Sequence, residues 1–139
     1  TKLIDELKLG AIDIGFLDEV PDPSVKQGLV SEPLVKEDLV LCGLSKIVPP
    51  ALRKETIRLT DLLKLPHITN HSGIEGVRKW YLHHFKRIPQ LNVSISINHP
   101  EGISTMIKKG WGLGVLPKQF IEKDIQSGKV LVIAGPKPT

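Results

Sequence analysis

Apolar residues recur along this chain with two spacings, one typical of helices and one typical of strands. Within 100–109, Ile, Met and Ile fall on one helical face, and a proline holds the first position, where a helix needs no N–H. Within 91–97, three apolar residues alternate with polar ones, as in a strand with one wetter face. Short apolar runs at 39–44 and 113–116 predict buried strands.

The same patterns predict elements along the whole chain. Helices are expected at 2–9, 60–65, 74–87, 100–110 and 119–126. Strands are expected at 12–17, 39–44, 67–69, 91–97, 113–116 and 130–133, the first of them buried on both faces. Residues 29–36 are expected to be extended and interrupted by Pro33. Strands that alternate with helices favour an α/β fold with parallel strands.

Gly110, Gly112 and Gly114 stand close together, as in a nucleotide-binding fingerprint. That motif requires a strand, the glycine turn and then a helix, so that phosphate meets the positive end of the helix dipole. Here the glycines follow a helix and precede a strand, so a phosphate would face carbonyl groups. The order excludes a dinucleotide site.

Composition narrows the class of protein further. The 139 residues are 40% hydrophobic and only 4% aromatic, so the core must be aliphatic. The net charge of +4 is spread along the chain and forms no stripe of the kind that binds nucleic acid, although it favours anionic ligands. No run approaches the roughly 18 apolar residues of a membrane span.

The single cysteine, Cys42, lies in the apolar run at 39–44. It allows no intrachain disulfide, which suits a reducing compartment. We expect a small buried hydrophobic residue there, with a redox sensor as the alternative.

Three segments together resemble one family. They read I-x-x-M-I-x-x-G-x-G-x-G-V-L-P at 103–117, L-K-L-G-A-I-D-I-G-F-L at 7–17 and S-E-P-L-V-K-E-D-L-V-L at 31–41. Their order and spacing resemble the effector-binding domain of LysR-type transcriptional regulators. The resemblance extends over nearly the whole chain.

The resemblance implies two Rossmann-like lobes joined by two crossover strands, with a ligand cleft between them, as in type 2 periplasmic binding proteins. The crossovers are expected near 33–36 and 114–117. Residues 1–36 with 114–139 would form lobe I, and 37–113 would form lobe II. Lobe I looks incomplete, because the family carries a further strand-helix-strand unit there. In the family, that unit and a winged helix-turn-helix DNA-binding domain precede the position of Thr1, so the chain resembles an N-terminally truncated regulator.

The sharpest local motif is a capping box, Ser72-Gly73-Ile74-Glu75, at the start of the longest predicted helix. The motif is a helix start in any case, but a helix N-terminus that faces a cleft also binds anions. The resemblance implies that Asn70, His71, Ser72 and Gly73 line the effector cleft, with the hydroxyl contacting a carboxylate or sulfate.

Asn98 and His99 begin the next predicted helix and are expected to face the same cleft, because ligands gather at the carboxyl ends of strands. One of them capping that helix is the alternative. Phe16 is expected to face the cleft from the other lobe.

Catalytic and metal-binding motifs are not found. His83 and His84 are adjacent and diverge by about 100° on a helix, so they cannot chelate together. No nucleophile elbow or phosphate loop occurs in the sequence. We therefore expect no enzyme, no metal and no cofactor.

The sequence thus predicts a small-molecule-sensing domain of a cytoplasmic bacterial LysR-type regulator. Its ligand would be a small organic or inorganic anion, and DNA would be bound only through the absent N-terminal domain. The resemblance implies a homodimer of this domain, a tetramer of the intact protein and no membrane contact. The alternative is a solute-binding protein of a transport system, which has the same fold.

Overall fold

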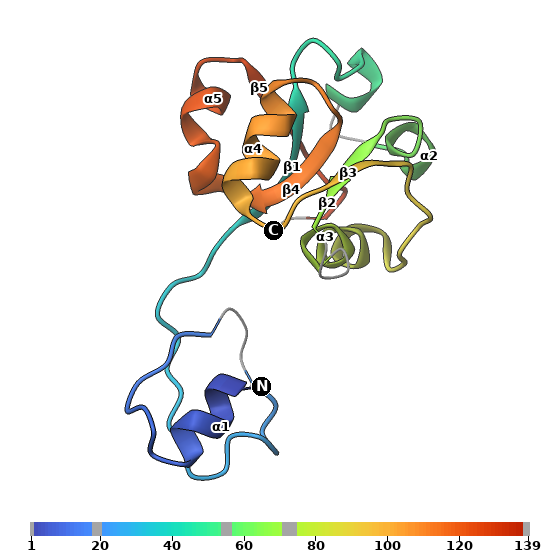
Figure 1. The fold of residues 1–139 in the computed structure, drawn as a ribbon. Helices are drawn as coiled ribbons and strands as arrows, with labels where there is room; N and C mark the ends of the chain where they lie inside the picture. The colour runs from blue at the N-terminus through green and yellow to red at the C-terminus, as the bar shows by residue number, and fades with distance from the viewer. Residues whose placement is uncertain (1, 18–20, 54–56, 71–74, 138–139) are drawn as a thin grey trace. The chain divides into compact units, whose positions relative to one another are not determined.

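The computed structural model describes most of the chain, namely residues 2–17, 21–53, 57–70 and 75–137. The chain forms two compact units, Thr1–Lys36 and Glu37–Thr139. Regular strands are found in the larger unit (Figure 1).

The larger unit is built on one five-stranded sheet with the strand order β3-β2-β4-β1-β5. Its strands are β1 (Leu39–Leu44), β2 (His67–Thr69), β3 (Val93–Ser96), β4 (Leu113–Pro117) and β5 (Val130–Ile133). Strand β2 runs parallel to β3 and β4, whereas β1 runs antiparallel to β4 and β5. The prediction of parallel strands is therefore wrong for β1, because an apolar run reports the burial of a strand and not its direction.

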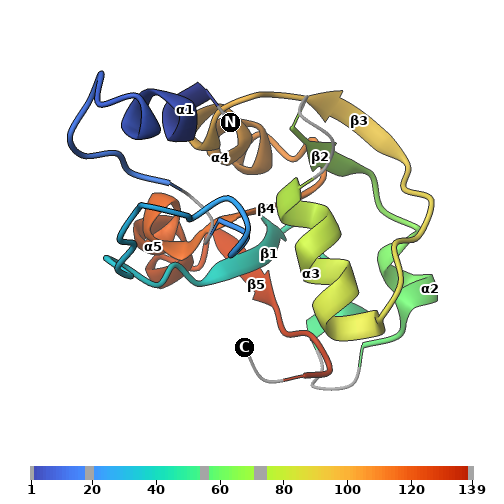
Figure 2. The same cartoon turned by 90° about the horizontal axis from the view of Figure 1, so that it is seen from below.

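Two layers of helices cover the two faces of this sheet (Figures 1 and 2). The helical segments are η1 (Pro50–Arg53), α2 (Leu59–Leu62), α3 (Glu75–Phe85), α4 (Pro100–Lys108), η2 (Lys118–Phe120) and α5 (Glu122–Gln126). The first three share one hydrophobic core with the sheet, and α4 and α5 pack on the second core.

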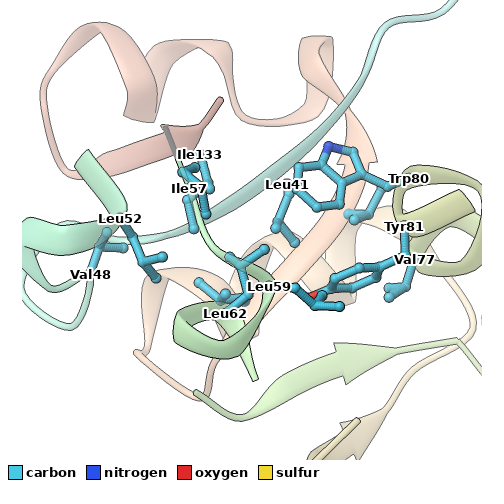
Figure 3. Close-up of a cluster of buried hydrophobic side chains, with 12 residues drawn as sticks. Leu41, Val48, Leu52, Ile57, Leu59, Leu62, Val77, Trp80, Tyr81 and Ile133 are labelled. Carbon is cyan, nitrogen blue, oxygen red and sulfur yellow. The ribbon is translucent and has the colours of Figure 1, made fainter. Parts of the chain in front are cut away.

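Alternation along the strands divides their side chains between the two cores. Leu41 of β1 (Figure 3) belongs to the core under α3, and so does Leu113 of β4. Cys42 and Leu116, on the same strands, belong to the core under α4. Because successive strand residues point to opposite faces, the short apolar runs serve both layers.

The smaller unit contains one described helix, α1 (Lys2–Lys8). The strand predicted at 12–17 is not formed, and Ile14, Phe16 and Leu17 are exposed rather than buried. A strand needs a neighbour for its N–H and C=O groups, and the described part of this unit supplies none. The prediction at 12–17 is therefore wrong for this structure.

Most other predicted elements are confirmed within two residues at each end. Two helices differ more: the one expected at 60–65 ends three residues earlier, as α2, and the one expected at 119–126 is divided into η2 and α5. Residues 114–133 share the sheet with β1 and β2. Their assignment to a lobe with residues 1–36 stays a prediction.

Candidate functional site

Two parallel strands, β2 and β3, end side by side, and β4 beside β2 runs in the same direction. Thr69 at the end of β2 is paired with Ser96 at the end of β3, and Ile68 is paired with Gly114 of β4. Asn70 directly follows β2, and Asn98 with His99 follows β3. We call this the strand-edge site. It brings together three residues that the sequence predicted for a common cleft.

The hydroxyl groups of Thr69 and Ser96 connect the ends of β2 and β3. The sequence analysis did not identify these two residues. The Thr69 Oγ1 and Ser96 Oγ atoms lie 2.9 Å apart and share a hydrogen bond. Just beyond, the Ile97 N–H donates to the Thr69 carbonyl at 2.8 Å. The position of Thr69 and Ser96 as polar residues at the ends of apolar strands could have indicated them. The contacts fix Asn70 and Asn98 on adjacent strand ends.

Asn70 carries an unsatisfied polar atom. Its side-chain Oδ1 is buried and accepts no hydrogen bond from any residue that the structure describes. A buried acceptor without a partner costs about 1–3 kcal/mol, so such atoms are rare in folded proteins. An amide oxygen in this condition is suited to accept a hydrogen bond from a ligand or a water molecule.

His99 is the N-cap of α4. Its Nδ1 accepts a hydrogen bond from the Gly102 N–H at 3.1 Å, with an extended backbone at φ −136° and ψ 146°. An accepting Nδ1 leaves a ring proton on Nε2. The same Nδ1 lies 3.6 Å from Glu101 Oε2. His99 remains largely exposed, and its other nitrogen is a donor at the strand edge. Capping and ligand contact are therefore compatible.

The other four residues predicted to contact a ligand are not among those that define the strand-edge site. His71, Ser72 and Gly73 lie outside the described residues, and with them the capping box. Phe16 belongs to the smaller unit, where its side chain is exposed.

The same edge of the sheet joins the two segments that flank the predicted crossovers. Leu39 at the start of β1 pairs with Pro117 at the end of β4. The Lys118 N–H donates to the Asp38 carbonyl at 2.9 Å, and the Gln119 amide donates to the Glu37 carboxylate at 2.9 Å. These bonds join the beginning of β1 to the end of β4.

The buried titratable groups are held in their neutral forms. Burial raises the pKa of the Cys42 thiol to about 12, which makes it inert as a nucleophile, as the prediction of a buried hydrophobic residue requires. Burial lowers the pKa of His67 to about 4.

In the part of the chain that the structure describes, no three His, Cys, Asp or Glu residues gather as a metal site would require. None of the described helices has the length and apolar character to span a membrane.

Comparison with known proteins points to one family. The LysR substrate binding domain family matches residues 1–139. An uncharacterised HTH-type transcriptional regulator of Escherichia coli K12, YeiE, is 26% identical over 129 residues, which are 91% of this chain and 41% of the relative. The chain therefore spans about two fifths of the curated relatives it matches.

Solved structures give the same result for the fold. HinK, a LysR family regulator from Pseudomonas aeruginosa, matches with a TM-score of 0.66 and 20% identity, over 99% of this chain and 46% of that chain. The effector-binding domain of QuiR in complex with shikimate matches with a TM-score of 0.61 and 18% identity, over 99% of this chain and 62% of that chain. The fold is that of LysR effector domains, the type 2 periplasmic-binding-protein fold.

Proposed function

The chain belongs to the LysR substrate binding domain family, and we propose from this premise that it senses a small anionic effector for a LysR-type transcriptional regulator. The observation that carries the proposal is the buried Asn70 Oδ1 without a partner at the strand-edge site. Ligands of α/β sheets bind outside the carboxyl ends of parallel strands, which is where Asn70 stands.

The chemistry of this edge suits an anion with donor groups. Helices α3 and α4 begin there, and the N-terminus of a helix carries the positive end of its dipole. His99 adds a ring N–H. The ligand would supply a hydroxyl or N–H to Asn70. We propose Ser72, His71 and Gly73 as further contacts, from their place in the capping box.

Effector binding would act on DNA through the rest of the regulator. We propose that ligand closes the two lobes and thereby changes how paired domains hold an N-terminal winged helix-turn-helix. The ligand can shift that equilibrium only by binding one arrangement more tightly than the other. The assembly would be a cytoplasmic homodimer of this domain within a tetramer. Domains of this family are regulatory, and we propose no catalytic role here.

A thermal-shift titration tests the site, with shikimate, inorganic phosphate and sulfate as probes and sodium chloride at equal ionic strength as the baseline. At a concentration of 100 Kd, a ligand stabilises the folded state by about 2.7 kcal/mol, which raises Tm by several degrees. We expect Asn70→Leu and Ser72→Arg to remove the specific shift. Without ligand, Asn70→Leu should leave Tm unchanged or raise it, because it deletes an unsatisfied buried atom.

Asn92→Leu is the matched control, because Asn92 is exposed and precedes β3 at the opposite end of that strand. It should keep the ligand-induced shift. A shift that survives both Asn70→Leu and Ser72→Arg would remove the strand edge from the site. No specific shift with any of the three anions would contradict the proposed ligand class.

A further inference from the structure

A cavity lies on the α3 face of the sheet, and its lining includes none of the strand-edge residues Asn70, Asn98 and His99. It has a volume of about 360 Å³ and is lined by Leu39, Val40, Trp80, His84, Val132, Ile133, Ala134, Gly135, Pro136 and Lys137. The strand-edge site is at the amino end of α3, whereas His84 is near its carboxyl end, and a helix of 11 residues is roughly 16 Å long. The two sites are therefore separate.

The floor of this cavity is apolar and aromatic. Trp80 is buried, and its ring centroid lies 4.4 Å from that of His84. The C-terminal segment closes over the histidine, because the Lys137 N–H donates to His84 Nδ1 at 3.3 Å. A Cβ atom at Gly135 would stand only 2.1 Å from His84 Nδ1, so this segment packs directly on the ring. Figure 2 shows this segment beside the end of α3.

The lining of the cavity contains one lysine. None of the lining residues is acidic, and Lys137 among them approaches the side chain of Lys86. This contact with Lys86, together with partial burial and charge repulsion, lowers the pKa of Lys137. Cations are favoured at a helix C-terminus, but two in contact repel each other unless an anion lies between them.

Lys86 also has an unusual backbone. It ends α3 at φ 59°, the left-handed region that glycine adopts without strain, and it is the one non-glycine residue with a positive φ in the described chain. A lysine here stabilises the helix end less well than glycine would. A positive φ at a residue other than glycine is a reason to look for a functional role of its side chain.

We propose that this cavity is a second ligand site, which binds a small anion with an apolar or aromatic group. The apolar group lies against Trp80 and the β1–β5 strands, and the anionic group lies between the ammonium groups of Lys137 and Lys86. The volume is at the lower end of the range for small-molecule sites, about 300–1,000 Å³.

Fluorescence of Trp80 tests this proposal, with phenylacetate as the probe. The chain has two tryptophans, so the exposed Trp111 is replaced in a Trp111→Phe background. We expect a saturable change with phenylacetate and affinities at least about fivefold weaker for 2-phenylethanol and for acetate, which each lack one half of the ligand. Lys137→Gln should weaken phenylacetate binding about fivefold.

Two further variants separate this proposal from general charge effects. Lys86→Gly should weaken binding by a similar factor and at the same time raise Tm, because glycine relieves the positive φ. Lys109→Gln is the matched control, a lysine at the end of α4, and should change nothing. Ser72→Arg should also leave binding intact, so this result stands apart from the effector proposal.

Several outcomes would overturn the second site. They are the lack of a saturable change into the tens-of-millimolar range, equal affinity for 2-phenylethanol, and an equal loss in Lys109→Gln.

Discussion

His67 and Tyr81 form a buried polar pair inside the α3 core. His67 Nδ1 donates to the Leu65 carbonyl at 3.0 Å, and Nε2 accepts from the Tyr81 hydroxyl at 2.7 Å. Both side chains are fully buried, and burial raises the pKa of Tyr81 as it lowers that of His67. Every polar atom of the pair is satisfied with the histidine neutral. A proton on Nε2 would reverse the bond to tyrosine and deprive the buried Tyr81 O–H of its acceptor.

Folding stability should therefore fall as the pH falls. The pKa of His67 is lowered from 6.5 to about 4, so the unfolded chain binds a proton that the folded chain does not. The stability is present above pH 6.5 and is lost between pH 6.5 and about 4. We expect a loss of about 2–3 kcal/mol from this group by pH 4.5, measured by urea unfolding at a series of pH values.

The control is a double variant, His67→Leu with Tyr81→Phe, which replaces both partners by apolar groups. It should fold and lack this part of the pH dependence. The same pH dependence in the double variant would mean that another group causes it.

At the scale of elements, glycines decide how closely helices approach the sheet. Gly114 lies under α4, where a Cβ atom would stand 2.8 Å from Ile107 Cδ1 and 3.0 Å from Ile103 Cγ2. Gly112, at φ 150°, would place a Cβ atom 2.4 Å from the Pro66 carbonyl oxygen. The glycines of this turn therefore serve close packing, which agrees with the exclusion of a dinucleotide site.

A matched pair of substitutions tests this explanation. Gly114→Ala overpacks the α4 core and should destabilise the fold by about 1–3 kcal/mol. Gly76→Ala, within α3, meets its nearest atom at 3.5 Å, which is an ordinary contact. It should stabilise the fold by about 0.5–1 kcal/mol, because alanine is the better helix former. Urea unfolding measures both changes, and similar changes of the same sign would contradict the packing argument.

At the scale of the whole chain, the two units differ in how much they bury. The larger unit has two apolar cores, whereas Ile4 is the only buried apolar side chain among the residues described in the smaller unit. Seven large apolar side chains of that unit are exposed, namely Leu9, Ile14, Phe16, Leu17, Val30, Leu34 and Val35. Segments with few buried contacts open with little free energy.

Amide hydrogen exchange on the chain of residues 1–139 should separate the two units. Amides of β1, β2 and β4 should be protected to near the global free energy of unfolding, because these strands lie inside the sheet. Amides of 12–17 and 29–36 should exchange rapidly. Strong protection at 12–17 would instead support the strand that the sequence predicted there.

The sequence by itself determined most of the elements of the larger unit and the resemblance to the family. Period-two and period-3.6 patterns are local, so β1, β4 and α4 could be located from their own residues. The buried state of Cys42 followed from its neighbours in the same strand. The prediction at 12–17 failed because an apolar segment forms a strand only when a partner strand pairs with its N–H and C=O groups.

Only the tertiary structure decided which of these residues meet. The antiparallel direction of β1, the pairing of Thr69 with Ser96 27 residues away, and the contact of Lys137 with His84 across 53 residues have no signal in the local pattern. Strand neighbours and hydrogen-bond partners are chosen by contacts between distant segments, which depend on how the layers pack. Asn70 and Asn98 could be proposed from the sequence. The unsatisfied Asn70 Oδ1 and the cavity beside Trp80 could be found only in the folded structure.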